Sequence, residues 1–214
     1  KTSKENPEGV NESLDNMKYI GAAAEKIYNN AANILNWMKL QNELITVNPE
    51  NIGLCDFVDE VLEPFMDVID QKSIELVNNI PEEDIIVSDT NIIKIILQNL
   101  ISNATKHTKT GTIEISSSLD ANEVTTIQVK DTGIGIPEKI LTKINAIKKQ
   151  TVAGEFDADD PDTGNQLGYF IIFDFARLIG GSVEINSEVG KGTVVKVFLP
   201  PPTEKSNELN AKKQ

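Results

Sequence analysis

Residues 99–108 read Asn99-Leu-Ile-Ser-Asn103-Ala-Thr-Lys106-His107-Thr108. They end a strongly apolar stretch and predict a helix that runs to about His107. Asn99, Asn103 and Lys106 follow one another at spacings of four and three residues, so they share one face of that helix. The opposite face is apolar and consists of Ile96, Leu97, Leu100, Ile101 and Ala104.

The polar face of this helix has two possible environments. Two amides and an ammonium would be costly to bury in a core, so they either face a cavity or form a solvent-exposed stripe. An amide oxygen is a suitable hard ligand for Mg²⁺, and a lysine ammonium neutralises a phosphate as a point charge. These residues alone favour neither environment.

Two further segments place glycines where the chain turns. Asp131-Thr-Gly133-Ile-Gly135-Ile-Pro137 directly follows a predicted strand, and its glycines allow a ligand to approach the backbone closely. The carboxylate at the end of that strand can accept a hydrogen bond from an exocyclic amine, such as that of adenine. Gly164-Asn-Gln-Leu-Gly168 opens a helix, whose N-terminal amides and dipole favour an anion. Each segment also has a purely structural explanation, as a tight turn or a helix start.

Hydrophobic periodicity predicts the remaining elements. From residue 14 to about 46, apolar residues recur at spacings of three and four, which favours a helix in a bundle over a long helix lying on its own domain. A second amphipathic helix follows Asn48-Pro49 and contains Pro64, which should kink it. A final helix is expected at about 168–179. Strands are expected at 74–78, 85–87, 112–118, 124–130, 183–186 and 193–199. Blocks of helices and antiparallel strands predict an α+β sandwich.

Composition limits the classes of protein that the chain can represent. The 214 residues carry a formal charge of −13, which argues against a nucleic-acid partner because phosphate neutralisation needs excess Lys and Arg. No run approaches the roughly 20 apolar residues that span a bilayer, so we expect no membrane contact by this segment. Cys55 is the single cysteine, which excludes an internal disulfide and a cysteine-rich metal site.

The order of the motifs is more specific than any one of them. The polar-faced helix, the strand-end Asp-x-Gly-x-Gly, the Gly-led helix and a hairpin with Gly190-Lys-Gly192-Thr193 follow one another. From about residue 14 to 200, the chain resembles sensor histidine kinases and, more widely, the gyrase, heat-shock chaperone and mismatch-repair ATPases. Residues 99–108 look like the N box of this superfamily, and the glycine segments look like its successive glycine motifs.

The resemblance implies a fold and a ligand. The fold would be a Bergerat-type α/β sandwich, with a mixed, mainly antiparallel sheet layered on helices, preceded by a long bundle-forming helix. Its ligand would be Mg·ATP. Residues 1–13 would be a hairpin loop or disordered end, 14–46 the second helix of the dimerisation and phosphoacceptor hairpin, 50–202 the ATP-binding catalytic domain, and 203–214 a disordered tail.

The resemblance also implies roles for single residues. Asn103 would ligate Mg²⁺, Lys106 would contact phosphate and Asp131 would hold the adenine amine. Further ATP-binding positions implied in the same way are His107 as a pocket wall, Gly133, Gly135, Ile136, Gly164, Leu167, Gly168, and Thr193 acting through water. Superfamily ATPases carry a water-activating Glu where this chain has Asn99, which cannot act as a general base. We therefore expect phosphate transfer in preference to hydrolysis.

Two departures from the family pattern affect what this segment can do. Histidine kinases carry an acceptor His on the first hairpin helix, whereas the single His here is His107, so the acceptor is expected outside the segment. The stretch from about residue 148 to 166 would be the lid over the triphosphate. There, Gln166 replaces a glycine of the family motif, and the aromatic Phe-x-x-Phe element before the lid is absent.

These observations lead to three functional hypotheses. The first is the catalytic region of a histidine kinase, which phosphorylates an acceptor helix of the same or a partner subunit and relays the phosphate to a response-regulator aspartate. Its parent protein would be a homodimer through residues 14–46, and a cytoplasmic segment of a membrane-anchored sensor. The second is a degenerate, non-catalytic module that regulates a partner through its helix bundle. The third, a stand-alone ATPase, is disfavoured by Asn99.

Overall fold

The computed structural model describes residues 20–21, 31, 35, 38, 45–149 and 163–201. At positions 147, 149 and 163–167 it describes the backbone alone. The predicted end 1–13, the predicted tail 203–214 and the greater part of the predicted bundle helix and lid lie outside these residues. The division of the chain into those segments therefore stays a prediction. Within the described residues, none of the helices is both long and apolar enough to cross a membrane.

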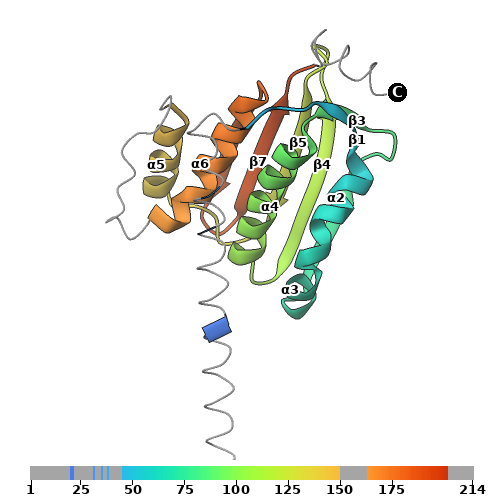
Figure 1. Ribbon diagram of the computed structural model, residues 1–214. Helices are drawn as coiled ribbons and strands as arrows, with labels where there is room; N and C mark the ends of the chain where they lie inside the picture. The colour runs from blue at the N-terminus through green and yellow to red at the C-terminus, as the bar shows by residue number, and fades with distance from the viewer. Residues whose placement is uncertain are drawn as a thin grey trace, which may run out of the picture.

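Helices and strands alternate irregularly along the described chain, and the helices gather on one side of a sheet (Figure 1). In chain order the elements are β1 (Glu50–Gly53), α2 (Leu54–Leu62), η1 (Glu63–Phe65), α3 (Met66–Gln71), β2 (Ile74–Asn79), β3 (Ile85–Ser88), α4 (Thr90–His107), β4 (Gly111–Leu119), β5 (Thr125–Asp131), α5 (Glu138–Lys149), α6 (Thr163–Leu178), β6 (Ser182–Glu188) and β7 (Gly192–Leu199).

The main sheet has five strands in the order β2-β4-β5-β7-β6. Its β2–β4 pair is parallel, and the other three pairs are antiparallel. β1 and β3 form a separate antiparallel pair, in which Glu50 lies opposite Ser88 and Gly53 opposite Ile85. The predicted α+β class, with a mixed and mainly antiparallel sheet layered on helices, is confirmed.

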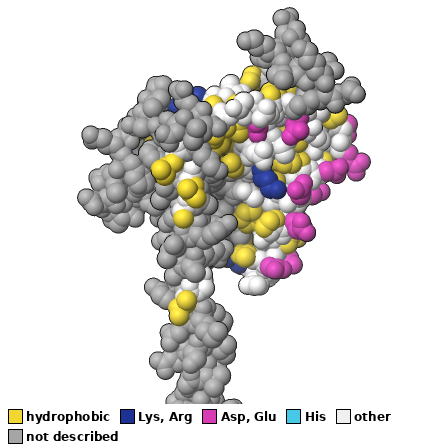
Figure 2. Space-filling model, viewed as in Figure 1, with side chains coloured by type: hydrophobic (Ala, Val, Ile, Leu, Met, Phe, Trp, Pro, Cys, Tyr) yellow, Lys and Arg dark blue, Asp and Glu magenta, His cyan; other side chains and the backbone are white. Residues whose placement is uncertain are grey.

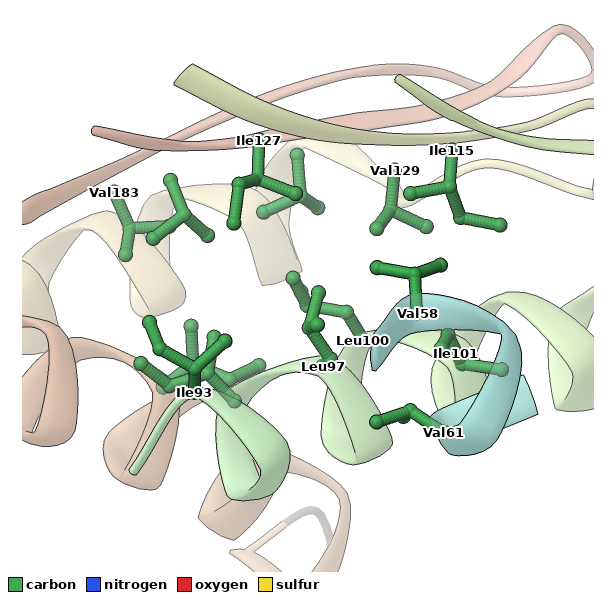
Figure 3. Packing of buried hydrophobic residues seen from close by; sticks show 14 of the residues in the cluster. Val58, Val61, Ile93, Leu97, Leu100, Ile101, Ile115, Ile127, Val129 and Val183 are labelled. Atoms are coloured by element: carbon green, nitrogen blue, oxygen red, sulfur yellow. The ribbon is translucent and has the colours of Figure 1, made fainter. Parts of the chain in front are cut away.

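The core lies between the sheet and a layer in which α4 contacts both α2 and α6. Figure 3 shows side chains of β4, β5 and β6 pointing from the sheet toward those of α4 and α2. Alternate strand residues such as Ile113 and Ile115 are fully buried, as are Ile92, Ile93 and Ile101 of α4. This packing identifies which face of α4 is turned to the sheet.

Polar contacts fix both ends of α4. At its start, Oδ1 of Asp89 accepts hydrogen bonds from the backbone N–H of Asn91 (3.0 Å) and Ile92 (3.1 Å), which satisfies donors that lack a helical partner. At its end, Nζ of Lys72 donates to the carbonyl oxygens of Thr105 (2.6 Å) and Thr108 (3.4 Å). The lysine thus places a positive charge at the negative end of the helix dipole.

Two elements differ from the sequence-based prediction. A helix was expected directly after Asn48-Pro49, but β1 comes first and pairs with β3, a contact too distant in sequence for periodicity to reveal. The final helix begins at Thr163 rather than near 168. The expected irregularity at Pro64 is present, because the short 3₁₀ segment η1 separates α2 from α3.

The core packing leads to a stability prediction. Ile101 is completely buried and Ile85 is 66% exposed, so the same truncation has different consequences at the two sites. We expect Ile101→Ala to lower the free energy of unfolding by about 2–5 kcal/mol, because it removes buried methyl groups and leaves a cavity. Ile85→Ala should change it by about 0.5 kcal/mol or less. Urea denaturation of both variants measures this, and equal losses would contradict the packing described.

Candidate functional site

A cavity of about 280 Å³ lies between the sheet strands β5 and β7 and the helices α4, α5 and α6. Its lining includes seven of the residues that sequence motifs singled out, namely Asn103, Lys106, His107, Asp131, Gly135, Ile136 and Thr193. Much of the remaining wall is apolar, with Leu100, Val129, Ile140, Ile144 and Val195. The fold therefore brings widely separated motifs to one hollow that is apolar with a few polar groups.

Asp131 supplies a buried carboxylate to this cavity. It ends β5, is only 9% exposed, and lies opposite Thr193 of β7. Its Oδ1 accepts a hydrogen bond of 2.8 Å from the backbone N–H of Gly133. Burial raises the pKa of the Asp131 carboxyl, an effect that the backbone N–H groups of Gly133 and Thr193 partly offset. The carboxyl is thus held in place with acceptor capacity left for a donor in the cavity.

The loop after β5 follows a path that requires glycine at two positions. A Cβ on Gly133 would lie 2.5 Å from the carbonyl oxygen of His107. Gly135 has φ +70°, and a Cβ there would lie 2.2 Å from the carbonyl oxygen of Glu188. Gly133 does not line the cavity itself, but its lack of a side chain lets the loop pass against the end of α4.

Hydrogen bonds tie this loop to two other elements. The backbone N–H of Ile134 donates to His107 O (3.1 Å), and the N–H of Gly190 donates to Ile134 O (2.9 Å). The N–H of Ile136 donates to Oγ of Ser187 (2.8 Å), and that hydroxyl also contacts Oγ1 of Thr193 (2.9 Å). Ser187 thus supports the loop after β5. The sequence motifs did not indicate it, because its role depends on the contact between its hydroxyl and the distant Ile136.

Asn99 and Asn103 lie where α4 meets α6. A Cβ on Gly168 would lie 3.3 Å from Oδ1 of Asn99 and 3.8 Å from Nδ2 of Asn103. Nδ2 of Asn99 donates to the carbonyl oxygen of Ile95 (2.8 Å), and Asn99 does not line the cavity. Nδ2 of Asn103 is buried and has no hydrogen-bond partner among the described residues. Asn103 therefore presents unsatisfied hydrogen-bonding capacity at the cavity, whereas Asn99 does not.

The remaining motif residues lie at the start of α6. Gly164 and Leu167 belong to the part of this helix whose backbone alone is described. Gly168 is buried, and its position explains the close approach of α6 to α4. Within the described ranges no group of three or more His, Cys, Asp or Glu side chains could hold a metal ion. A cation here would therefore need ligands from a bound molecule as well as from the protein.

Two ionisable rings line the cavity. Partial desolvation at the cavity wall lowers the pKa of His107, whose side chain is otherwise exposed, and the charges of Lys106 and Lys72 lower it further, so the neutral imidazole is favoured. Burial, followed by the charge of Asp131, raises the pKa of Tyr169 to about 12. The sequence analysis did not single out Tyr169, because its position in the predicted helix is one that an ordinary apolar residue could occupy.

Comparison with known proteins places this geometry in a family. Residues 88–203, more than half of the chain, match the family described as histidine kinase-, DNA gyrase B- and HSP90-like ATPases. The chain belongs to this family. The matched stretch contains every residue that lines the cavity between α4, α6 and the sheet.

Relatives narrow the class of this ATP-binding domain. The chain is 30% identical over 220 residues to the hybrid signal transduction protein dokA of Dictyostelium discoideum. This alignment covers 96% of this chain and 13% of dokA. The chain is 27% identical to the sensor histidine kinase AtsR of Burkholderia thailandensis, covering 87% of this chain and 31% of the relative. The chain is a catalytic domain of the sensor histidine kinase type and spans under a third of the length of these relatives.

Solved structures agree on the fold. A full-length ShkA in complex with AMPPNP has a TM-score of 0.68 at 21% identity, covering 88% of this chain and 39% of that one. The catalytic domain of histidine kinase ThkA has a TM-score of 0.56 at 22% identity, covering 71% of this chain and 95% of that one. The expected histidine kinase catalytic fold is confirmed.

Glycine requirements in the ATP-binding domain can be separated by a matched pair of substitutions. Gly135 and Gly190 have φ +70° and +79°, but only at Gly135 would a Cβ collide, since nothing lies within 4 Å of one at Gly190. We expect Gly135→Ala to weaken ATP binding about tenfold or more, equivalent to 1.4 kcal/mol, because the loop must shift. Gly190→Ala should show only the backbone strain, about 1–2 kcal/mol of stability. Calorimetric titration with ATP compares them, and equal affinities would refute the steric argument.

The lowered pKa of His107 predicts a pH-dependent stability. The unfolded chain protonates this residue near pH 6.5, whereas the folded domain does so at lower pH. Between those values the unfolded state binds more protons, so stability falls as pH falls. His107→Phe should remove this part of the dependence, and no other histidine is present to replace it. Urea unfolding of both proteins from pH 7.5 to 5 measures it, and parallel stability curves would contradict it.

Proposed function

We propose that this chain transfers the γ-phosphate of Mg·ATP to a histidine outside the segment, for relay to an aspartate of a response regulator. The observation that carries the proposal is one cavity lined by a buried carboxylate, a buried unpartnered amide and a lysine, from Asp131, Asn103 and Lys106. These groups match the three parts of the ligand: a base with an amine, a cation and a phosphate chain.

Mg²⁺ fits the donor set at this cavity. Asn103 lines the cavity, and the oxygen of its amide is a ligand that Mg²⁺ accepts. The atom of this amide without a partner is Nδ2, a donor that could meet a phosphate oxygen. When bound, the cation would neutralise charge on the phosphates and orient them. Mg²⁺ commonly binds through one or two protein groups plus substrate phosphates and water. A single amide therefore agrees with the lack of an acidic cluster among the described residues.

The protein groups would act mainly by positioning. Asp131 would hold the 6-amino group of adenine, and Lys106 would carry a positive charge to the phosphates. In the transfer step the bond between the γ-phosphorus and the bridging oxygen breaks, a phosphorus–nitrogen bond to the acceptor imidazole forms, and ADP leaves. Such a step requires little covalent chemistry from the protein, since alignment and charge neutralisation supply most of the rate enhancement.

The environment of Asn99 supports transfer over hydrolysis. Its amide donates to the carbonyl oxygen of Ile95, and its oxygen faces the backbone of Gly168 in α6. An amide cannot take a proton from water at neutral pH, so this position lacks a general base. ATP would then be kept for an acceptor. The stand-alone ATPase hypothesis is disfavoured for the same reason.

The acceptor would have to come from another part of the parent protein. His107, the single histidine, lines the cavity next to Lys106, which suits a pocket wall. We propose that the acceptor lies on a helix of the same or a partner subunit, in a homodimer formed through residues 14–46. A cytoplasmic location of this segment within a membrane-anchored parent belongs to the same proposal.

A second candidate is a non-catalytic module that regulates a partner kinase through its helix bundle. The observation in its favour is the altered lid sequence, with Gln166 in place of a glycine and no Phe-x-x-Phe element before it. Both candidates would bind nucleotide, so binding does not separate them. Phosphorylation of an acceptor supplied in trans does.

The test combines binding with transfer and uses a matched asparagine. We expect Asn103→Ala to weaken Mg²⁺-dependent ATP binding by about 10- to 100-fold, the usual cost of losing one contact to a charged group. Asn91→Ala makes the same change at an exposed position of the same helix and should bind normally. Calorimetry with Mg²⁺ or with EDTA provides the affinities.

Transfer is measured with radiolabelled ATP and a separately produced acceptor hairpin of a related histidine kinase. The unmodified chain and Asn91→Ala should label the hairpin, and Asn103→Ala should not. Tight ATP binding without labelling would favour the regulatory module. No nucleotide binding by the unmodified chain would refute both candidates.

A further inference from the structure

Tyr169 is a polar residue of the cavity to which the proposed function assigns no role. It follows Gly168 in α6, and the close approach of Gly168 to Asn99 and Asn103 fixes this part of α6 against α4. Tyr169 lines the cavity together with Asp131 and is half-buried. The Tyr169 phenol therefore lies in the wall of the same cavity as the Asp131 carboxylate that would hold the base.

The Tyr169 side chain borders the cavity beside mainly apolar residues, and its hydroxyl is not among the buried atoms that lack a partner. A hydroxyl that borders a cavity can be satisfied there by water or by a bound molecule. Burial and the nearby charge of Asp131 keep the phenol protonated to about pH 12, which makes it a donor at every physiological pH. The cavity thus offers one hydroxyl donor and one carboxylate acceptor.

The carboxylate and the phenol together suit the edge of a purine base, which presents a donor beside an acceptor. Adenine presents a donor, its 6-amino group, beside ring nitrogens that accept, whereas guanine presents an acceptor oxygen at the same carbon. Guanine can also turn a donor to a carboxylate, its N1–H, with its carbonyl oxygen beside it as the acceptor, so the two groups do not by themselves separate the purines. For the adenine of ATP, the donor turned to Asp131 is the 6-amino group. An acceptor beside that donor would then be available to Tyr169.

We propose that Tyr169 is a base-binding residue whose hydroxyl donates a hydrogen bond to the adenine ring nitrogen beside the 6-amino group, N1 or N7. The inference rests on the proposed binding of ATP and adds a second polar contact to the base. It assigns the hydroxyl, rather than the aromatic ring, to recognition. Removal of the hydroxyl alone therefore tests it.

The experiment pairs a conservative substitution with nucleotide analogues that lack one acceptor. Affinities for Mg·ATP, 1-deaza-ATP and 7-deaza-ATP are measured by calorimetry for the unmodified chain and for Tyr169→Phe. Tyr28→Phe makes the same chemical change outside the matched residues 88–203 and is the control. Circular dichroism during urea unfolding checks that each variant folds.

We expect Tyr169→Phe to weaken ATP binding about three- to tenfold, the range for one neutral hydrogen bond. The analogue that lacks the contacted nitrogen should bind the unmodified chain as weakly as it binds Tyr169→Phe, because the two deletions remove the same bond. Tyr28→Phe should bind all three nucleotides as the unmodified chain does.

Two results would overturn the inference while leaving ATP binding intact. One is an unchanged ATP affinity in Tyr169→Phe, and the other is an equal loss with both analogues, which would indicate a general change in the pocket. Failure of the unmodified chain to bind any of the three nucleotides would refute the proposed function itself, and this inference with it.

Discussion

The rotational setting of α4 is the constraint on which the rest of the molecule depends. One face of this helix is buried against the sheet through residues such as Leu97 and Ile101. Successive residues of an α-helix are about 100° apart around its axis. A rotation of the helix by one residue position would therefore turn Asn103 toward the core and an isoleucine away from it, at the cost of burying an amide. Asp89 at one end and Lys72 at the other hold the helix in this setting. The polar face is thereby left to meet α6 and the cavity.

The far side of the cavity is fixed by backbone instead of by side chains. The loop after β5 hydrogen-bonds to the last turn of α4 and to the β6–β7 turn, so three elements meet through main-chain groups around Ile134. Contacts this close leave no room for a Cβ at Gly133 or Gly135. The surface in Figure 2 shows acidic side chains distributed over one side of the described domain, consistent with the net charge of −13. An anionic ligand must therefore be neutralised locally, which is the part proposed for Lys106 and a cation at Asn103.

Much of this arrangement was predictable from sequence because it is local or periodic. The end of α4, the alternation of β4 and β5 and the two glycine segments all depend on near neighbours along the chain. Features that depend on distant contacts were missed. β1 exists because Asn51 lies opposite Val87, and Ser187 matters because its hydroxyl meets Ile136. Tyr169 was overlooked for a related reason, since nothing along the chain shows which side of α6 faces a cavity.

The same geometry separates holding a nucleotide from using it. Asn99 is tied to its own helix and cannot activate water, and the single histidine forms part of the cavity wall. On the proposed function, the domain would therefore keep ATP aligned but could not discharge it alone. Phosphoryl transfer gains most of its rate from alignment, so an acceptor helix tethered nearby would act through a high effective concentration. Control of the reaction would then lie in how often that helix reaches the cavity, and a signal that changes the bundle could regulate the rate without altering any residue of the site.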